Sequence, residues 1–240
     1  MAAVSRKIIF VSAVAMCVVC GFAWGYLHMQ KLHLHVGESM KDVLAGNERA
    51  NYDPNVMFDN VPITWPVNDM VPQTFDMTYD EPGSAIRFPH ARLVWATQYA
   101  GVVTGILIGA SEKKETLSAL IGEVQQLAPQ FKQAGWTQKG SLPTLEALRS
   151  GVAGVKTDAV EGGILAFQRG SVTAVMQIQG YSGQQGVSSE DSASYSLGVQ
   201  FTDAALQDAQ QTKTYKEHLR VKGSIDATMP LSYWLNGTKR

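Results

Sequence analysis

Cysteine is almost absent from this sequence. The 240 residues contain two cysteines, Cys17 and Cys20, and both lie in one apolar run near the start. The chain after residue 27 therefore has no thiol for a disulfide, for a zinc site or for nucleophilic catalysis. Cysteine chemistry is excluded for everything that follows the apolar run.

An excess of charge of either sign is also missing. The formal net charge is −1, and charged residues make up 17% of the chain. Beyond Lys41 no group of lysines and arginines gathers, which argues against a nucleic-acid partner. Heptads, repeats of fixed period and low-complexity tracts are absent as well. Coiled-coil proteins, repeat proteins and low-complexity chains are therefore excluded.

The most distinctive feature that is present is the apolar run IIFVSAVAMCVVCGFAWGYL, residues 8–27. Twenty residues of α-helix span about 30 Å, close to the hydrocarbon thickness of a bilayer. The run has no polar stripe of period 3.6, which a core helix would show. We predict a retained signal-anchor, whose membrane-facing side chains include Ile8, Phe10, Val18, Phe22, Trp24 and Tyr26.

A cleaved signal peptide is the main alternative for this run. Gly21 and Ala23 put small residues at the −3 and −1 positions of a possible cleavage site. The apolar run continues past that site to Leu27, which favours retention. Lipidation of the cysteines is disfavoured, because Met16 and Val19 precede them where a small residue is expected.

The charges that flank the run set its orientation. Arg6 and Lys7 lie directly before it, while the basic residues after it are spread out among acidic ones. We therefore expect a cytoplasmic tail at 1–7, the anchor at 8–27 in a bacterial inner membrane, and the rest of the chain in the periplasm. That rest divides into a juxtamembrane helix and extended linker at 28–72 and an α+β domain at 73–240.

The linker region has a pattern of its own. A short helix is expected near 38–46, and the four prolines at 54–72 indicate an extended stretch that lays Val61, Ile63 and Trp65 on a surface. A chain that starts near residue 36 is expected to fold by itself.

Strand patterns begin at residue 74. TFDMTYD alternates Phe75, Met77 and Tyr79 with polar neighbours, and the Pro82–Gly83 pair then predicts a turn. The apolar runs 85–97 and 101–110 predict a hairpin whose strands are packed on both faces, with Pro89 at a bulge or an edge.

A long helix follows, with Ser111 as its expected N-cap and Gly135 at its end. Its buried stripe is predicted to contain Leu117, Leu120, Ile121, Val124, Leu127, Ala128 and Phe131. A shorter helix at 143–150, three alternating strands at 163–169, 171–179 and 194–202, and a terminal helix complete the pattern. Strands joined by short hairpins, with grouped helices, predict an α+β fold: a mainly antiparallel sheet in β-β-β-α-α-β-β-β order with helices on one face.

A search for chemistry finds only weak candidates. His28, His33 and His35 lie close together but lack a carboxylate or cysteine at metal-binding spacing, so no metal or other cofactor is expected. The GYSG at 180–183 departs from the G-x-S-x-G nucleophile elbow, and neither His90 nor His218 is placed beside Ser182 by sequence. Asp76, Asp80 and Glu81 lie close together, as the two catalytic carboxylates of a glycosidase would, but acidic residues are common where a strand ends. We therefore interpret them as an ordinary strand end.

The polar segment 181–194 is longer than most connections between paired strands, and such loops are often functional or mobile. If the domain binds a protein, we expect contacts from this loop at Ser182, Gln184, Gln185, Glu190 and Asp191.

The sequence thus favours a membrane-anchored, non-enzymatic periplasmic domain that binds another protein, for example an immunity protein that blocks the toxin of a rival bacterium. A cell-envelope hydrolase with a scattered active site and a structural subunit of an envelope or secretion complex are the alternatives. A catalytic site would form a concave pocket with convergent titratable groups, whereas a binding module would present a convex patch.

Overall fold

The computed structural model describes residues 30–47, 63–65, 74–149, 163–180 and 195–222. Every described helix and strand belongs to the unit that runs from Lys31 to Arg240. In these ranges no helix is both long and apolar enough to cross a bilayer. The anchor expected at 8–27 lies outside the described residues, so the transmembrane helix remains a prediction.

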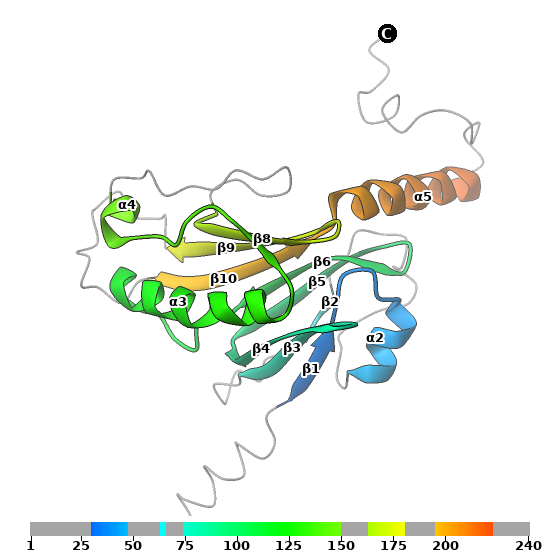
Figure 1. Ribbon diagram of the computed structural model, residues 1–240. Coiled ribbons are helices and arrows are strands. Elements are labelled where there is room, and N and C mark those ends of the chain that lie inside the picture. The colour runs from blue at the N-terminus through cyan, green and yellow to red at the C-terminus, as the bar shows by residue number, and fades with distance from the viewer. Residues whose placement is uncertain (1–29, 48–62, 66–73, 150–162, 181–194, 223–240) are drawn as a thin grey trace, which may run out of the picture. The chain divides into compact units, whose positions relative to one another are not determined.

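The described residues of this unit form two sheets (Figure 1). The smaller sheet has the order β1 (Lys31–Leu34), β3 (Phe75–Glu81), β4 (Ser84–Ala91). The larger sheet has the order β2 (Ile63–Thr64), β5 (Leu93–Tyr99), β6 (Val102–Gly109), β10 (Tyr195–Thr202), β9 (Val172–Gly180), β8 (Leu165–Arg169), β7 (Thr137–Lys139). Among the strands that the structure describes, only the β1–β3 pair is parallel. The described helices are α2 (Met40–Gly46), α3 (Leu117–Gln133), α4 (Leu145–Arg149) and α5 (Ala204–Lys222). The prediction of an α+β fold with a large, mostly antiparallel sheet is confirmed.

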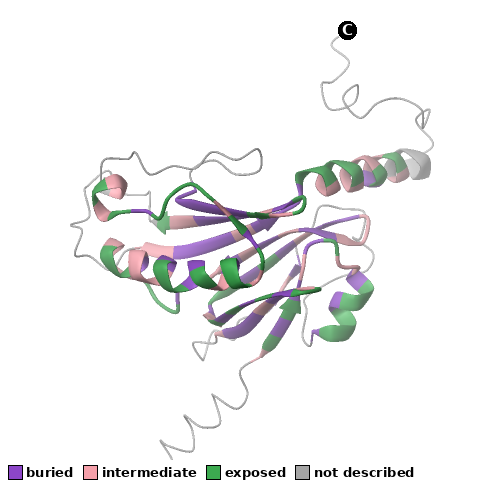
Figure 2. Cartoon of the chain, in the orientation of Figure 1, coloured by how far each residue is buried: buried purple, intermediate pink, exposed green. Residues whose placement is uncertain are grey.

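One hydrophobic core joins the two sheets and α3. Phe201 of β10 stacks on Tyr79 of β3, with ring centroids 4.0 Å apart, and lies 5.9 Å from the ring of Phe131 in α3. The inner face of the large sheet is therefore covered by α3 and by the small sheet together. Figure 2 shows that buried residues concentrate on the strands, whereas α5 is mostly half-buried or exposed.

Several elements agree with the sequence patterns. Phe75, Met77 and Tyr79 are buried on β3, and the turn at 82–83 joins it to β4. The helix α3 buries five of its seven predicted stripe residues, while Leu117 and Ile121 are half-buried. It ends before Gly135, whose φ of 81° suits a residue without a side chain. The three later strands and both shorter helices also lie where they were expected.

The hairpin expected between the runs 85–97 and 101–110 is present, but only the second half of the run 85–97 belongs to it, because the run is two strands in two different sheets. Its first half, β4, pairs with β3, and its second half, β5, pairs with β6. Pro89 lies on an edge strand, and the register moves from Met77↔Phe88 to Phe75↔Ala91, so β4 has one extra residue there. The edge and the bulge expected at Pro89 are both present, because proline cannot donate to a ladder.

Ser111 is not the N-cap of the long helix. The helix begins at Leu117, and the Thr116 side chain accepts a hydrogen bond from the Ala119 N–H at 3.2 Å. Glu115 exchanges backbone hydrogen bonds with Tyr195, at 2.7 Å and 3.1 Å. Because this bridge pairs Glu115 with the first residue of β10, the chain is still extended there and the helix starts later than the acidic residues suggest.

The segment 28–72 contributes three elements that belong to the core. Leu32 and Leu34 of β1 are fully buried, as are Val43 of α2 and Ile63 of β2. The short helix is confirmed, and Ser39 is its N-cap. Trp65 is also buried, while Val61 lies outside the described residues. A start at residue 36 would remove β1 with its two buried leucines, so such a chain is no longer expected to fold by itself.

Candidate functional site

Most residues that the sequence singles out for contacts cannot be located. The loop residues Ser182, Gln184, Gln185, Glu190 and Asp191 lie outside the described residues, as do the anchor residues between Ile8 and Tyr26. Tyr195 and Gly180, which flank the loop, are register partners. The loop therefore leaves and re-enters the sheet at adjacent strands, and its role in binding stays a prediction.

Asp76 has an ion-pair partner from the neighbouring strand. Its two carboxylate oxygens accept hydrogen bonds from Arg87 of β4, at 2.8 Å from Nε and 2.7 Å from Nη2. These hydrogen bonds hold the pKa of Asp76 below its ordinary value, although burial opposes the shift. A carboxylate that stays ionised in this way is a poor general acid.

The other two acidic residues of β3 have basic partners of their own. Asp80 lies 3.6 Å from Nδ1 of His33, and Glu81 lies 3.5 Å from Nη1 of Arg169. Arg169 also donates to the Pro82 carbonyl oxygen at 3.0 Å, so it ties the β8–β9 turn to the β3–β4 hairpin. The three carboxylates therefore bind different elements together rather than facing one substrate.

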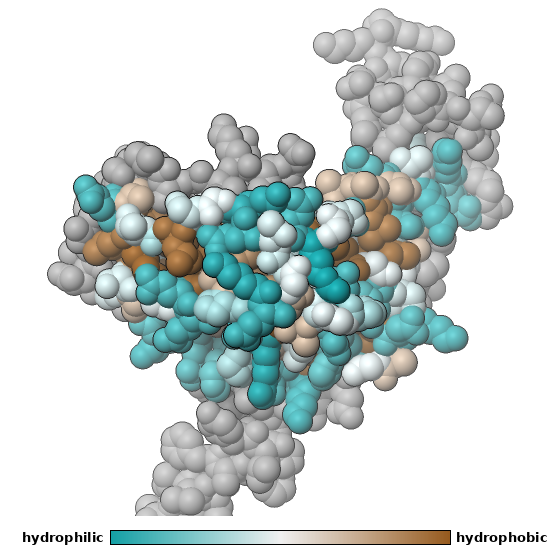
Figure 3. Space-filling model, viewed as in Figure 1, coloured by the Kyte–Doolittle hydropathy of each residue, from teal (hydrophilic) through white to brown (hydrophobic). Residues whose placement is uncertain are grey.

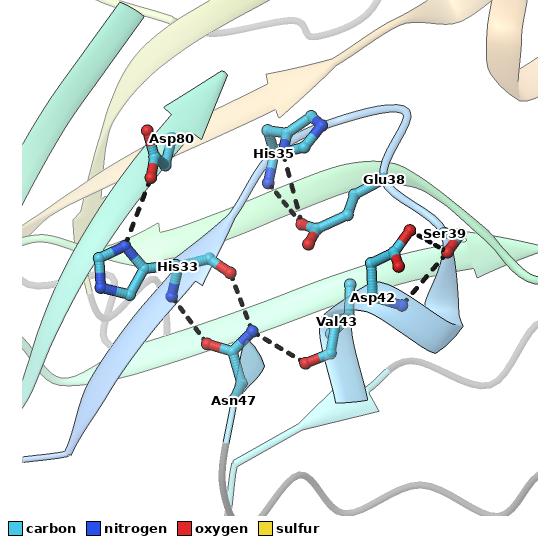
Figure 4. A network of polar contacts seen from close by, with 8 residues as sticks. All are labelled: His33, His35, Glu38, Ser39, Asp42, Val43, Asn47 and Asp80. Carbon is cyan, nitrogen blue, oxygen red and sulfur yellow. Dashed lines mark hydrogen bonds and ion pairs between the residues drawn. The ribbon is translucent and has the colours of Figure 1, made fainter. Parts of the chain in front are cut away.

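The histidines of the first strand belong to a polar network (Figure 4). The Asn47 side chain accepts from the His33 N–H at 2.7 Å and donates to the His33 carbonyl oxygen at 2.9 Å. Since β1 is an edge strand, Asn47 takes the place of a neighbouring strand. The Asn47 side chain also donates to the Val43 carbonyl oxygen at 2.9 Å, so its hydrogen bonds link β1 to the end of α2.

His35 makes a second contact of this kind, with Glu38. The Glu38 carboxylate accepts from the His35 N–H at 3.1 Å and lies 3.5 Å from its Nδ1. Burial raises the pKa of Glu38, although the hydrogen bond from His35 opposes the shift. His28 lies outside the described residues, and within the described ranges no three His, Cys, Asp or Glu side chains gather to hold a metal ion.

The register of the large sheet divides its side chains into two faces. The inner face, which lies against the core, has apolar side chains at Val94, Ala96, Ile106, Ile108, Val199, Phe201, Ala174, Met176, Leu165 and Phe167. The opposite side, called the outer face below, consists of Leu93, Trp95 and Thr97 of β5, Gly105, Leu107 and Gly109 of β6, Gly198, Gln200 and Thr202 of β10, Thr173, Val175 and Gln177 of β9, and Ala166 and Gln168 of β8.

The outer face carries no charged side chain. A sheet face in water usually bears lysines and glutamates, because these residues are seldom buried. Here the positions hold glutamines, threonines, glycines and apolar residues, and the nearest charge in register is Lys139 of β7, opposite Ala166. Interfaces between proteins are depleted of charge at their centre and enriched in aromatic residues.

Two large apolar side chains stand out from this face. Trp95 is 41% exposed and Leu93 is 36% exposed, at alternate positions of β5. Leu93 is the register partner of Gly109, and a side chain at Gly109 would come within 3.1 Å of the Leu93 Cβ. The glycine thus leaves room for Leu93 to lie flat on the sheet. The small residues Gly198, Val175, Ala166 and Thr202 of the outer face are buried.

Amide side chains occupy the middle of the outer face. The Gln177 Nε2 donates to the Gln200 Oε1 at 3.0 Å, across the β9–β10 pair. Next to them, the Gln179 side chain extends over Gly198, where an added Cβ would come within 2.8 Å of the Gln179 Nε2. Leu93, Trp95 and these amides form a neutral surface on which donors, acceptors and apolar area alternate.

Sequence reasoning missed this surface, because the apolar runs of β5 and β6 were interpreted as packed on both faces. Leu93 and Trp95 contradict that interpretation, since both are exposed whereas their neighbours Val94 and Ala96 on the inner face are buried. Hydropathy could not distinguish the exposed Leu93 and Trp95 from the buried Val94 and Ala96, because all four residues are apolar. The signal that could have found the surface is the lack of charge at alternate positions of four strands.

The side of the molecule seen in Figure 3 is mostly hydrophilic along its middle, and its hydrophobic residues gather in two areas, one near α4 and α3 and the other at the start of α5. There Leu206 packs against the core and lies near Gly37. This apolar area therefore belongs to the attachment of α5, and the outer face stays the main candidate.

Comparisons of this chain with protein-family models, with curated proteins and with solved structures find no match.

Proposed function

We propose that this chain is a membrane-anchored, non-enzymatic protein of the bacterial inner membrane whose folded part binds another protein in the periplasm. An immunity protein that blocks a toxin is one form of such a protein. The observation that carries the proposal is the uncharged outer face with Trp95 exposed on it. Large exposed aromatic side chains in a neutral surface are the usual centres of protein interfaces.

The binding surface is tested by photo-crosslinking in cells. A photoreactive residue in place of Trp95 is expected to give a discrete crosslinked protein product, whose yield falls when Leu93 is changed to Ser. The matched control places the same residue at Leu142, which is 39% exposed but lies outside the sheet. Equal products from both positions, or none from position 95, would overturn the proposal.

The membrane placement is tested by accessibility. Protease added to intact spheroplasts is expected to degrade the folded part, because the charges before the apolar run favour a cytoplasmic tail. If the folded part were degraded only after the cells are lysed, the orientation would be the opposite of the one proposed.

A further inference from the structure

The edge of the first strand, β1, is covered by the chain that follows it (Figure 4). Among the strands that the structure describes, β1 pairs with β3 alone. The backbone groups on the other side of an edge strand are a template for an extended segment of another chain. In β1 these groups belong to His33 and His35, and each of them already has a partner within the same chain.

Asn47 takes the place of a residue in a neighbouring strand. A side-chain amide has an acceptor oxygen and a donor NH₂ group, the same kinds of group as a peptide unit. Its Oδ1 accepts from the His33 N–H at 2.7 Å, and its Nδ2 donates to the His33 carbonyl oxygen at 2.9 Å. Asn47 is only 3% exposed, and its backbone N–H donates to the Val43 carbonyl oxygen at the end of α2. An incoming strand would have to displace this side chain.

Glu38 pairs with His35 in a similar way. Its carboxylate accepts from the His35 N–H at 3.1 Å, and its backbone N–H donates to the His35 carbonyl oxygen at 3.4 Å. The Glu38 carbonyl oxygen accepts in turn from the Val103 N–H of β6 at 2.9 Å, which ties this segment to the large sheet. The edge of β1 is thus closed at both of its outward residues.

We propose that Asn47 and Glu38 block the edge of β1 and so keep it from pairing with the β1 strand of a second copy of this chain. Two copies of one edge strand can pair antiparallel around a two-fold axis. Leu32 and Leu34 are fully buried, so the strand stays formed when the block is removed. This inference goes beyond the proposed function, because it concerns the small sheet and not the outer face of the large sheet.

The test removes the block and measures the protein mass of the full chain in mild detergent by light scattering. The wild type is expected to contain 26.1 kDa of protein, a monomer, over the whole range of concentrations. Asn47→Ala frees the N–H and the carbonyl oxygen of His33, so the mass should rise with concentration to that of a dimer or more. Glu38→Ala in addition should strengthen the association, because it frees the His35 N–H.

A proline at the freed edge shows whether the association uses β1. His33→Pro removes the N–H that points away from β3, and proline is tolerated at such a position of an edge strand. Asn47→Ala combined with His33→Pro should therefore be monomeric again. Ser39→Ala is the matched control, since it removes the N-cap of α2 without freeing a backbone group of β1, and it should stay monomeric.

The outcomes decide for or against the block, with unchanged circular dichroism as the sign that a variant is folded. A folded Asn47→Ala that stays monomeric at every concentration would overturn the inference, as would an association that survives His33→Pro. A wild type that associates and becomes monomeric with His33→Pro would show an open edge and overturn it as well.

If Asn47→Ala does not fold, Glu38→Ala alone decides the question. It leaves the hydrogen bonds of Asn47 in place and frees only the His35 N–H. A smaller rise in mass with concentration would support the block, and a mass equal to that of the wild type would overturn it.

Discussion

At the scale of single residues, two buried side chains, Trp136 and Ser111, form hydrogen bonds with partners that are distant in the sequence. The buried Nε1 of Trp136 donates to the Ser84 Oγ at 2.7 Å. Ser111 donates to the Glu123 Oε2 at 2.6 Å and accepts from the Leu197 N–H at 2.8 Å. Burial also raises the pKa of Glu123, which the bond from Ser111 opposes. Each such bond joins two elements, so its loss leaves a buried group without a partner.

Ser111 and Thr116 have different roles, and substitutions separate them. Ser111→Ala should lower the free energy of unfolding by about 1–3 kcal/mol, because the buried Leu197 N–H loses its acceptor. Thr116→Ala should cost about 1 kcal/mol, the usual loss of an N-cap. Urea unfolding of both variants measures these values. An unchanged free energy of unfolding in Thr116→Ala would show that Thr116 is not the N-cap of α3.

The Asp76–Arg87 pair predicts a pH dependence of stability. Because Arg87 holds the pKa of Asp76 below its ordinary value, the ionised carboxylate stabilises the fold at neutral pH. This contribution is complete above the unfolded-state pKa of about 3.9 and is lost as the pH falls through the lowered pKa. Arg87→Gln should therefore lower the melting temperature by a few degrees at pH 7, with a difference from wild type that shrinks in acid. Arg92→Gln is the matched control on an exposed arginine, and a difference that is constant with pH would contradict the linkage.

At the scale of elements, the sequence predicted best where one periodicity ran without interruption. The alternation on β3 and the stripe of α3 identify buried positions directly, because one face of each is apolar and the other is polar. The pattern fails at 85–97, where the β5 part is apolar on both faces and the break at Arg92 between two sheets is not apparent. The alternation of Leu32, His33 and Leu34 is typical of a half-buried strand, but the position of these residues directly after the apolar run predicts that they belong to the juxtamembrane segment and not to the folded domain.

Aspartate substitutions at two adjacent positions, Leu120 and Ile121, test which face of α3 is buried. Leu120 is fully buried whereas Ile121 is half-buried, so Leu120→Asp should cost about 4 kcal/mol or more through an unpaired buried charge. Ile121→Asp should be tolerated better, because Ile121 is only half-buried although the sequence pattern places it in the buried stripe. Thermal melts of the two variants give the comparison, and equal losses would show that the face is assigned wrongly.

The first strand sets where the folded part can be shortened. A chain that starts at residue 36 loses Leu32 and Leu34, and full burial of a leucine side chain contributes about 1.5–3 kcal/mol. Together these amount to a large part of a typical stability of about 5–15 kcal/mol. A chain that starts at residue 30 should therefore be folded and soluble, and one that starts at residue 36 should be poorly folded. Equal melting temperatures would show that β1 is dispensable.

At the scale of the whole molecule, the pairing of strands decides which residues meet, and this information is not local. The outer face is composed of strands from both halves of the chain, because β6 pairs with β10 across more than eighty residues. No periodicity within one strand reports that pairing. The apolar half of each strand could be predicted, whereas the assembly of Trp95 with Gln177 and Gln200 needed the register.

The same long-range pairing makes Phe201 the centre of the unit. Its ring lies within 4.0–6.2 Å of the rings of Tyr79, Phe88, Phe131 and Trp136, which come from the small sheet, α3 and the chain that follows α3. Phe201→Ala should therefore lower the free energy of unfolding by about 3–5 kcal/mol. Phe201→Leu fills more of the space and should cost less.

Because one core serves both sheets, they should unfold together. Tryptophan fluorescence, which includes Trp136 beside Phe201, and far-ultraviolet circular dichroism should give the same midpoint in wild type and in Phe201→Leu. If the small sheet were instead held only by its own strand pairs, Phe201→Leu would shift the fluorescence transition ahead of the loss of secondary structure. Two separate midpoints would then show that the ring cluster does not couple the two sheets.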